Sequence, residues 1–131
     1  MTFPPPPPYV EGHDLLAGKT VLVTAAAGSG IGFAVAKRCQ EEGARLVIAD
    51  KHERRLAESA AELGVLGVPC DVTQEADVQN LFAAAAEELG GIDVLINNAG
   101  LGGTAQLHEM TDEQWSIVLD VTLNHCPAPL A

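Results

Sequence analysis

Short runs of apolar residues alternate with longer amphipathic stretches from residue 19 to residue 124. Runs rich in Val, Ile and Leu are typical of buried strands, and four such runs occur, at 21–23, 46–49, 65–68 and 92–96. The stretches between them place apolar residues three or four positions apart, as helices do, at 31–42, 52–63 and 73–89. We therefore predict four strands, with a helix after each of the first three.

Several residues mark where the predicted helices begin and end. Gly43 and Gly64 follow the first two helices, where glycine commonly ends a helix. Thr73 is expected to cap the third helix, because acidic residues occupy the first turn after it. Thr111, with Gln114 nearby, predicts the start of a last helix. Apolar faces are expected on the first helix at Ile31, Ala34, Val35 and Cys39, and on the last helix at Trp115, Val118, Leu119 and Thr122.

The alternation of strands with helices indicates βαβ units. Their right-handed crossovers build a parallel sheet with helices on both faces, so the predicted fold class is α/β. Residues 17–124 are expected to form this domain.

The two ends of the chain have a different composition. Residues 1–16 contain a run of prolines at 4–8, which favours an extended tail. Such a run can bind aromatic grooves, but a passive leader is the favoured interpretation. Residues 125–131 contain Pro127 and Pro129, which stop a helix, so this segment is expected to be a second tail.

Charge and cysteine content exclude several classes of protein. Eighteen acidic residues against seven basic ones give a formal net charge of −11, which disfavours binding to nucleic acid or to an anionic membrane. The sequence lacks the apolar run that a membrane span requires. Cys39, Cys70 and Cys126 fit neither a disulfide framework nor a metal site. We expect a cytoplasmic globular protein with reduced thiols and no bound metal.

A glycine-rich segment, 24–32, joins the first strand to the first helix. Gly28, Gly30 and Gly32 allow the backbone to bend tightly and to approach a pyrophosphate, whose charge the start of the helix favours. By itself, the segment is also compatible with a simple tight turn, which is the less favoured interpretation.

Asp50 ends the second strand, about 20 residues beyond Gly30. A carboxylate there accepts hydrogen bonds from ribose hydroxyls and repels the extra phosphate of NADP, so NAD is the favoured cofactor. Lys51, Arg54 and Arg55 partly offset this repulsion. The alternative is an Asp that only caps the second helix.

Polar or glycine-containing segments also follow the third and fourth strands, at 70–72 and 97–100. Ligands of parallel sheets bind at the carboxyl ends of the strands. Each segment alone is compatible with turn chemistry, but four such segments in order favour a dinucleotide site.

These residues together resemble the short-chain dehydrogenase/reductase family over roughly residues 16–124. Members carry a Thr-Gly-x-x-x-Gly-x-Gly turn, an acidic residue after the second strand, an Asp-Val pair, an Asn-Asn-Ala-Gly run and an Asn on the next helix. The resemblance implies a doubly wound Rossmann-type sheet of three layers, incomplete here, with strand order 3-2-1-4.

The resemblance also implies roles for individual residues. Asp71 and Val72 would hold the adenine, Asn97 would tie the central strands together, and Asn124 would belong to the catalytic tetrad. The cofactor-binding set is Thr24, Gly28, Ser29, Gly30, Ile31, Gly32, Asp50, Asp71, Val72, Asn98, Ala99 and Gly100. Ala25 departs from the family pattern by replacing its first Gly, and one additional residue separates Thr24 from Gly30.

The catalytic Ser and the Tyr-x-x-x-Lys pair of the family would follow Asn124. The chain has one tyrosine, Tyr9, beside the proline run. We expect a chain truncated by a reading-frame change near Asn124 or by an incomplete gene sequence. An exposed fourth strand and last helix then predict a poorly soluble or homo-oligomeric product.

Three hypotheses about function follow. The first is an NAD-dependent oxidoreductase acting, in full-length form, on a secondary alcohol or ketone of hydroxyacyl or steroid-like type. The second is a half-domain that binds nucleotide or docks onto relatives without catalysis. The third is an inactive remnant.

Overall fold

A four-stranded parallel sheet lies at the centre of the computed structural model, which describes residues 3–103 and 105–124. The strands are β1 (Thr20–Val23), β2 (Arg45–Asp50), β3 (Leu66–Pro69) and β4 (Val94–Ile96). They lie in the order β3-β2-β1-β4, and every neighbouring pair is parallel. Both the α/β class and the predicted strand order are confirmed.

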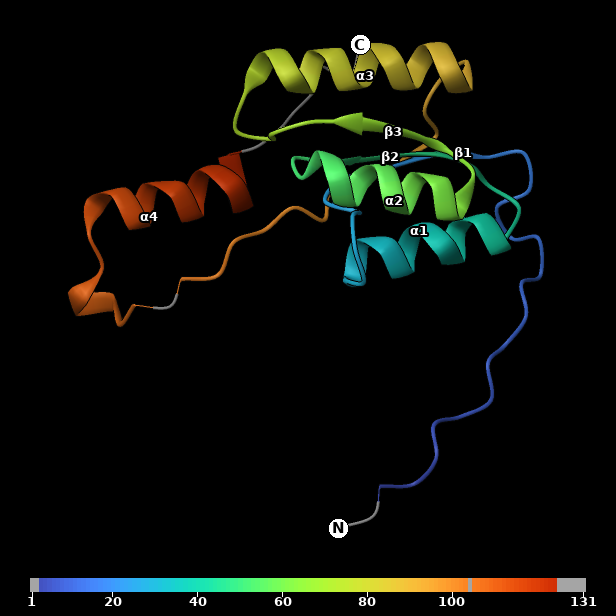
Figure 1. Cartoon of the computed structure of the whole chain (residues 1–131), viewed down its shortest axis with the longest axis horizontal. Helices are drawn as coiled ribbons and strands as arrows, with labels where there is room; N and C mark the ends of the chain where they lie inside the picture. The colour runs from blue at the N-terminus through green and yellow to red at the C-terminus, as the bar shows by residue number, and fades with distance from the viewer. Residues whose placement is uncertain (1–2, 104, 125–131) are drawn as a thin grey trace.

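Helices cover both faces of the sheet (Figure 1). Side chains alternate between the two faces along each strand. On β1, Val21 and Val23 face the cluster packed beneath α1 (Ile31–Glu41) and α2 (Glu53–Leu63), whereas Leu22 faces α3 (Glu75–Leu89). Because a buried cluster covers each face of the sheet, the strands carry apolar residues on both faces. This explains their runs of Val, Ile and Leu.

Two details of the predicted helices are wrong. On α1, Ile31 is 77% exposed, and the buried residues are Gly32 and Ala36. The helix approaches the sheet through its small residues, so the buried face is displaced by one position. The cap of α3 is Gln74 rather than Thr73, because Thr73 donates both its N–H and its hydroxyl to Asp71.

The last part of the described chain contains η1 (Leu107–Glu109), α4 (Asp112–Leu119) and η2 (Asp120–Asn124), the last a π-helical turn. The predicted start of α4 is confirmed, because Thr111 and Gln114 form a reciprocal capping box. No residue of α4 is fully buried, and Trp115 is 50% exposed. Its expected apolar face is therefore largely open to solvent.

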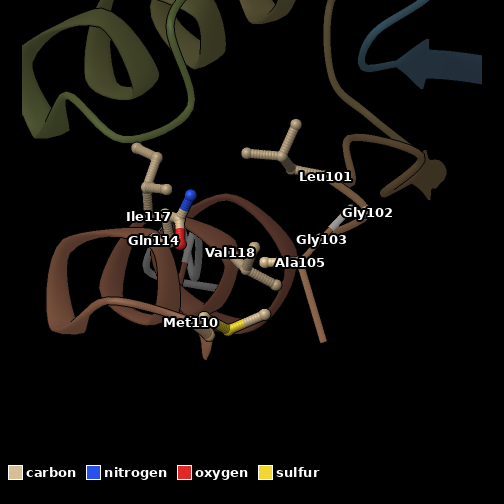
Figure 2. A pocket seen from close by; sticks show the side chains of 8 residues that line it. All are labelled: Leu101, Gly102, Gly103, Ala105, Met110, Gln114, Ile117 and Val118. Carbon is tan, nitrogen blue, oxygen red and sulfur yellow. The ribbon is translucent and has the colours of Figure 1, made fainter. Parts of the chain in front are cut away.

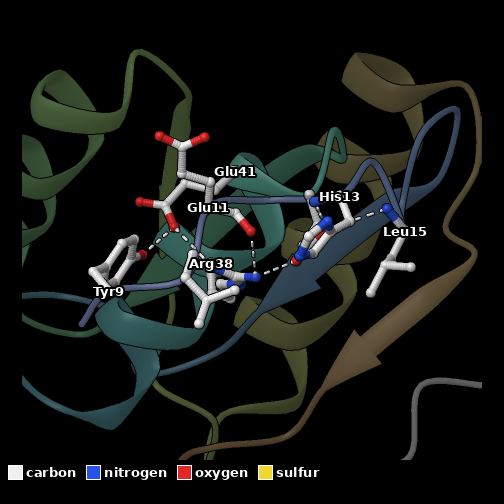
Figure 3. A network of polar contacts seen from close by, with 8 residues as sticks. Tyr9, Glu11, His13, Leu15, Arg38 and Glu41 are labelled. Atoms are coloured by element: carbon white, nitrogen blue, oxygen red, sulfur yellow. Dashed lines mark hydrogen bonds and ion pairs between the residues drawn. The ribbon is translucent and has the colours of Figure 1, made fainter. Parts of the chain in front are cut away.

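Part of the predicted N-terminal tail contacts the domain (Figure 3). Residues 3–8 are exposed and extended. Further along, the buried carboxylate of Glu42 accepts hydrogen bonds from the N–H groups of His13 and Leu15, at 2.8 and 3.2 Å. Tyr9 donates its hydroxyl to Glu41, and Arg38 pairs with Glu42. The segment from Tyr9 to Leu15 is thus anchored to the end of α1.

The predicted C-terminal tail, 125–131, lies outside the described residues. Among the helices that are described, none combines the length and apolar character needed to cross a membrane.

Candidate functional site

A cavity of about 340 Å³ opens at the edge of the sheet where the strands end. Because all strands are parallel, the segments that follow them meet at this edge. The cavity is lined by five of the predicted site residues: Asp50, Asp71, Val72, Ala99 and Gly100. The structure therefore brings together residues from three separate strand ends.

The carboxylate of Asp50 is buried and holds two backbone groups. Its Oδ2 accepts the N–H of Ala27 at 3.1 Å, and its Oδ1 accepts the N–H of His52 at 2.9 Å. An ionised carboxylate has about four acceptor positions, so about two remain for a ligand. Helix α2 is capped at His52 without a side-chain hydrogen bond, so Asp50 is not the capping residue that the alternative interpretation required.

The glycine-rich turn is held close to α1. A Cβ added at Gly32 would lie 2.3 Å from the carbonyl oxygen of Ala25 and 2.6 Å from Nδ2 of Asn98, so this position has no room for a side chain. Gly28 has a φ of +85°, which glycine adopts without strain. Ala25 has a φ of +51°, at the position where the family pattern has its first Gly. The replacement therefore places a side chain in the left-handed region.

The exposed residues Ser29, Gly30 and Ile31 lie where this turn enters α1. Gly30 is the N-cap residue, and no side chain caps this end of the helix. The first N–H groups of a helix lack partners within it and carry partial positive charge. The turn thus offers an anion a set of backbone donors beside Ala25, which itself lines the cavity.

Thr24 and Asn98 join the glycine-rich turn to the segment after β4. The hydroxyl of buried Thr24 accepts the N–H groups of Asn98 and Ala99, at 3.0 and 3.4 Å. The amide of Asn98 donates to the carbonyl of Ala25 at 3.0 Å. Asn97, which was expected to tie the strands together, is exposed. The side-chain amide that bonds the glycine-rich turn belongs to Asn98 instead.

Asp71 and Cys70 line the cavity where β3 ends. Hydrogen bonds from the N–H and hydroxyl of Thr73 lower the pKa of Asp71, and the charge of Lys51 lowers it further. Burial, together with the charges of Asp77 and Asp71, raises the pKa of Cys70 to about 11. At neutral pH this edge therefore presents an anionic carboxylate beside an unreactive thiol.

Asn124 is not among the residues that line the cavity. It lies exposed in η2, and its amide donates to Asp120 at 2.9 Å. The hydroxyl of Thr122 bonds the backbone of Leu101, and Val121 from the same turn lines the cavity. Tyr9 lies by the end of α1, at the opposite edge of the sheet from Asp50.

A smaller cavity of about 130 Å³ lies between α4 and the loop that follows Gly100 (Figure 2). Its lining is mostly apolar and includes Leu101, Met110, Ile117 and Val118. Leu101 and Ile117 also line the larger cavity, so the two hollows share two residues.

The model of the short chain dehydrogenase family matches residues 19–126, most of the chain. The chain belongs to the short-chain dehydrogenase family. The match covers all four strands and the cavity edge described above.

Individual relatives agree with this assignment. A Mycobacterium tuberculosis protein, (5R,7aS)-5-hydroxy-7a-methyl-1-oxo-2,3,5,6,7,7a-hexahydro-1H-indene-carboxyl-CoA reductase, is 54% identical over 123 residues, covering 89% of this chain and 47% of the relative. A crystal structure of a short chain dehydrogenase from Mycobacterium smegmatis superposes with a TM-score of 0.88 at 50% identity, covering 91% of this chain and 51% of the other.

A third relative was solved with a cofactor. The 3-ketoacyl-(acyl-carrier-protein) reductase from Brucella melitensis, complexed with NADH, has a TM-score of 0.77 at 37% identity, covering 81% of this chain and 44% of that structure. The chain spans about half the length of each of these relatives.

Several residues that line the large cavity are not in the predicted cofactor-binding set. Most of them lie within or next to a predicted motif, and that position is the signal by which they could have been found. These residues are Ala25, Lys51, His52, Cys70, Thr73 and Leu101. Ile117 and Val121 are different, because they come from the end of α4 and from η2. Their spacing of four residues places both on one helix face, which is the signal that the sequence carried for them.

Proposed function

We propose that this chain forms the adenine-dinucleotide-binding half of a short-chain oxidoreductase and that its cofactor is NAD. The observation that carries the proposal is the cavity lined by Asp50, Asp71 and Val72 beside an uncapped helix N-terminus. Asp50 would accept the adenosine ribose hydroxyls, and Val72 would contact the adenine. The amides between Ser29 and Gly32 would face the pyrophosphate.

The preference for NAD over NADP rests on the charge of Asp50. Its carboxylate is fixed by Ala27 and His52, so it cannot turn away from a phosphate on the ribose. A shallow hollow of about 430 Å³ beside it is lined by Lys51, His52, Glu53, Arg54 and Arg55. Its basic residues Lys51, Arg54 and Arg55 reduce the repulsion of NADP without removing the nearer negative charge of Asp50.

Calorimetric titration of the chain with NAD and with NADP tests the proposal. We expect wild type to bind NAD more tightly than NADP. Asp50→Asn should lose about tenfold in affinity for NAD, and its affinities for NAD and NADP should differ less than those of wild type. Asp93→Asn is the matched control, because the carboxylate of Asp93 likewise accepts two hydrogen bonds, from the N–H and the hydroxyl of Thr20, but at the opposite edge. Absence of NAD binding to folded wild type would refute the proposal.

For the whole protein we propose interconversion of an alcohol and a ketone on a hydroxyacyl or fused-ring substrate. Support comes from the mycobacterial relative, whose name describes a reductase of an indene-carboxyl-CoA compound. The tyrosine of these 131 residues lies away from the cavity. We therefore expect this chain to bind NAD without oxidising alcohols, and the assay is NADH absorbance with simple secondary alcohols.

A second candidate is a half-domain that binds nucleotide without catalysis. The exposed apolar side chain of Trp115 on α4 favours it, because it leaves apolar surface open to a partner. NAD binding without turnover supports this candidate over the inactive remnant, and turnover would contradict it.

A further inference from the structure

Three consecutive amides of the glycine-rich turn are tied to the second βα unit. Ala26 N–H donates to the carbonyl of Ala49 at 3.0 Å, and Ala27 N–H donates to Asp50 at 3.1 Å. Gly28 N–H donates to the hydroxyl oxygen of Ser59 at 2.9 Å. The first two acceptors lie at the end of β2, whereas Ser59 lies in the middle of α2.

Ser59 is a buried polar residue on a face of α2 that is otherwise apolar. It is 4% exposed, and the other buried residues of the helix are Leu56 and Leu63. A buried N–H without an acceptor is destabilising, and the hydroxyl oxygen of Ser59 supplies the acceptor for the Gly28 N–H. A serine among these leucines therefore serves its hydrogen bond to Gly28.

This hydrogen bond affects the course of the glycine-rich turn. Gly28 is in the left-handed region, and the chain next passes through exposed Ser29 to Gly30, where α1 begins. Fixing Gly28 therefore fixes the residue from which the loop departs toward the start of α1. The turn has one more residue before Gly30 than the family pattern. A longer turn has more conformational freedom, and the hydrogen bond to Ser59 of α2 restricts it.

We propose that Ser59 is a positioning residue for the pyrophosphate of the cofactor, acting through Gly28. The inference rests on the proposed dinucleotide site and adds a residue of α2 to it. Ser59 does not touch the cofactor. It holds the turn so that the amides at the start of α1 converge on one anion.

The test compares ligands that do and do not carry a pyrophosphate. For Ser59→Ala we expect about fivefold weaker binding of NAD and of ADP by calorimetry, with adenosine binding unchanged. Adenosine reports on Asp50, Asp71 and Val72, which the substitution leaves in place. The control is Ser116→Ala, because Ser116 is exposed on α4.

Amide hydrogen exchange of the unliganded chain provides a second measurement. Ser59→Ala should speed exchange at Gly28 and leave the amides of β1 protected. Unchanged NAD and ADP affinities, or an equal loss for all three ligands, would overturn the inference while leaving the proposed function standing. If wild type binds adenosine but neither ADP nor NAD, both proposals fail.

Discussion

Gly32 is the residue at which the backbone of the site has the least free space. Its Cα hydrogen faces the carbonyl of Ala25 and the amide of Asn98, two groups that are already bonded to each other. Both partners sit on segments fixed by Thr24, so neither can move independently. A glycine here is therefore a packing requirement, in contrast to Gly28, where the requirement is conformational.

We predict that Gly32→Ala lowers the free energy of unfolding by about 1–3 kcal/mol, because the added methyl group would lie 2.3 Å from a carbonyl oxygen. Urea unfolding followed by circular dichroism measures this. Gly30→Ala is the matched control, since a Cβ at Gly30 meets nothing within 4 Å. Equal effects of the two substitutions would contradict the close approach.

The pKa of Asp71 provides a prediction about pH. Thr73 keeps this pKa below the ordinary value of 3.8, so ionised Asp71 stabilises the fold above that pH, and this contribution is lost as the pH falls through the lowered pKa. Thr73→Val removes the hydroxyl donor and should raise the pKa of Asp71 toward 3.8. An NMR titration of the carboxyl carbons measures it, with Asp93 as an internal reference that should not move.

At the level of elements, the sequence predicted the order and type of the helices and strands well. The spacing of apolar residues along each element distinguishes a helix from a strand. The strands are apolar on both faces, and Gly64 ends α2 in the left-handed conformation that glycine favours. The errors came where tertiary contacts decide. Ile31 looks like a core residue, but the close approach at Gly32 turns it outward.

The candidate site was likewise predicted in part: its residues at strand ends were found from the sequence, and those held by distant contacts were not. Asp50, Asp71 and Val72 were predicted from their places at strand ends, which fix their location in any parallel sheet. Ser59 was missed because its hydrogen bond joins residues 31 positions apart, and a serine within an Ala- and Glu-rich helix gives no local signal. The anchoring of the N-terminal segment was missed for the same reason.

We predict that Glu42→Gln loosens the segment around His13 and Leu15. The substitution removes the charge that two backbone N–H groups and Arg38 bind. Those bonds lower the pKa of Glu42, so the wild-type anchor is intact above the ordinary value of 4.5 and is lost as the pH falls through the lowered one.

Limited proteolysis and amide exchange measure this loosening. Faster cleavage before Leu16 is expected in Glu42→Gln, whereas Glu62→Gln, an exposed residue of α2, should behave as wild type. An N-terminal segment equally protected in both variants would show that Glu42 is not its anchor.

For the whole molecule, the uneven distribution of apolar surface is the main feature. The sheet is sandwiched between α1 and α2 on one face and α3 on the other, whereas α4 lies apart from them (Figure 1). Trp115, Ile117 and Leu123 are exposed by 50%, 45% and 72% on α4 and η2. Large apolar side chains exposed on one short segment of the chain favour association with another surface.

We predict that the chain self-associates through α4 at micromolar concentrations. Sedimentation velocity should show a concentration-dependent increase in mass that Trp115→Glu reduces. Leu15→Glu is the control, because Leu15 is 75% exposed but lies on the N-terminal segment. A monomer at all concentrations, or equal effects of both substitutions, would contradict this.

The central claim is that the edge where the strands end binds an adenine dinucleotide. An amide NMR titration with NAD tests it most directly, because every backbone position reports separately. We predict shifts at Gly30, Asp50, Asp71 and Ala99, with Asp93 at the opposite edge unmoved. Shifts confined to the opposite edge, or no shifts at saturating NAD, would contradict it.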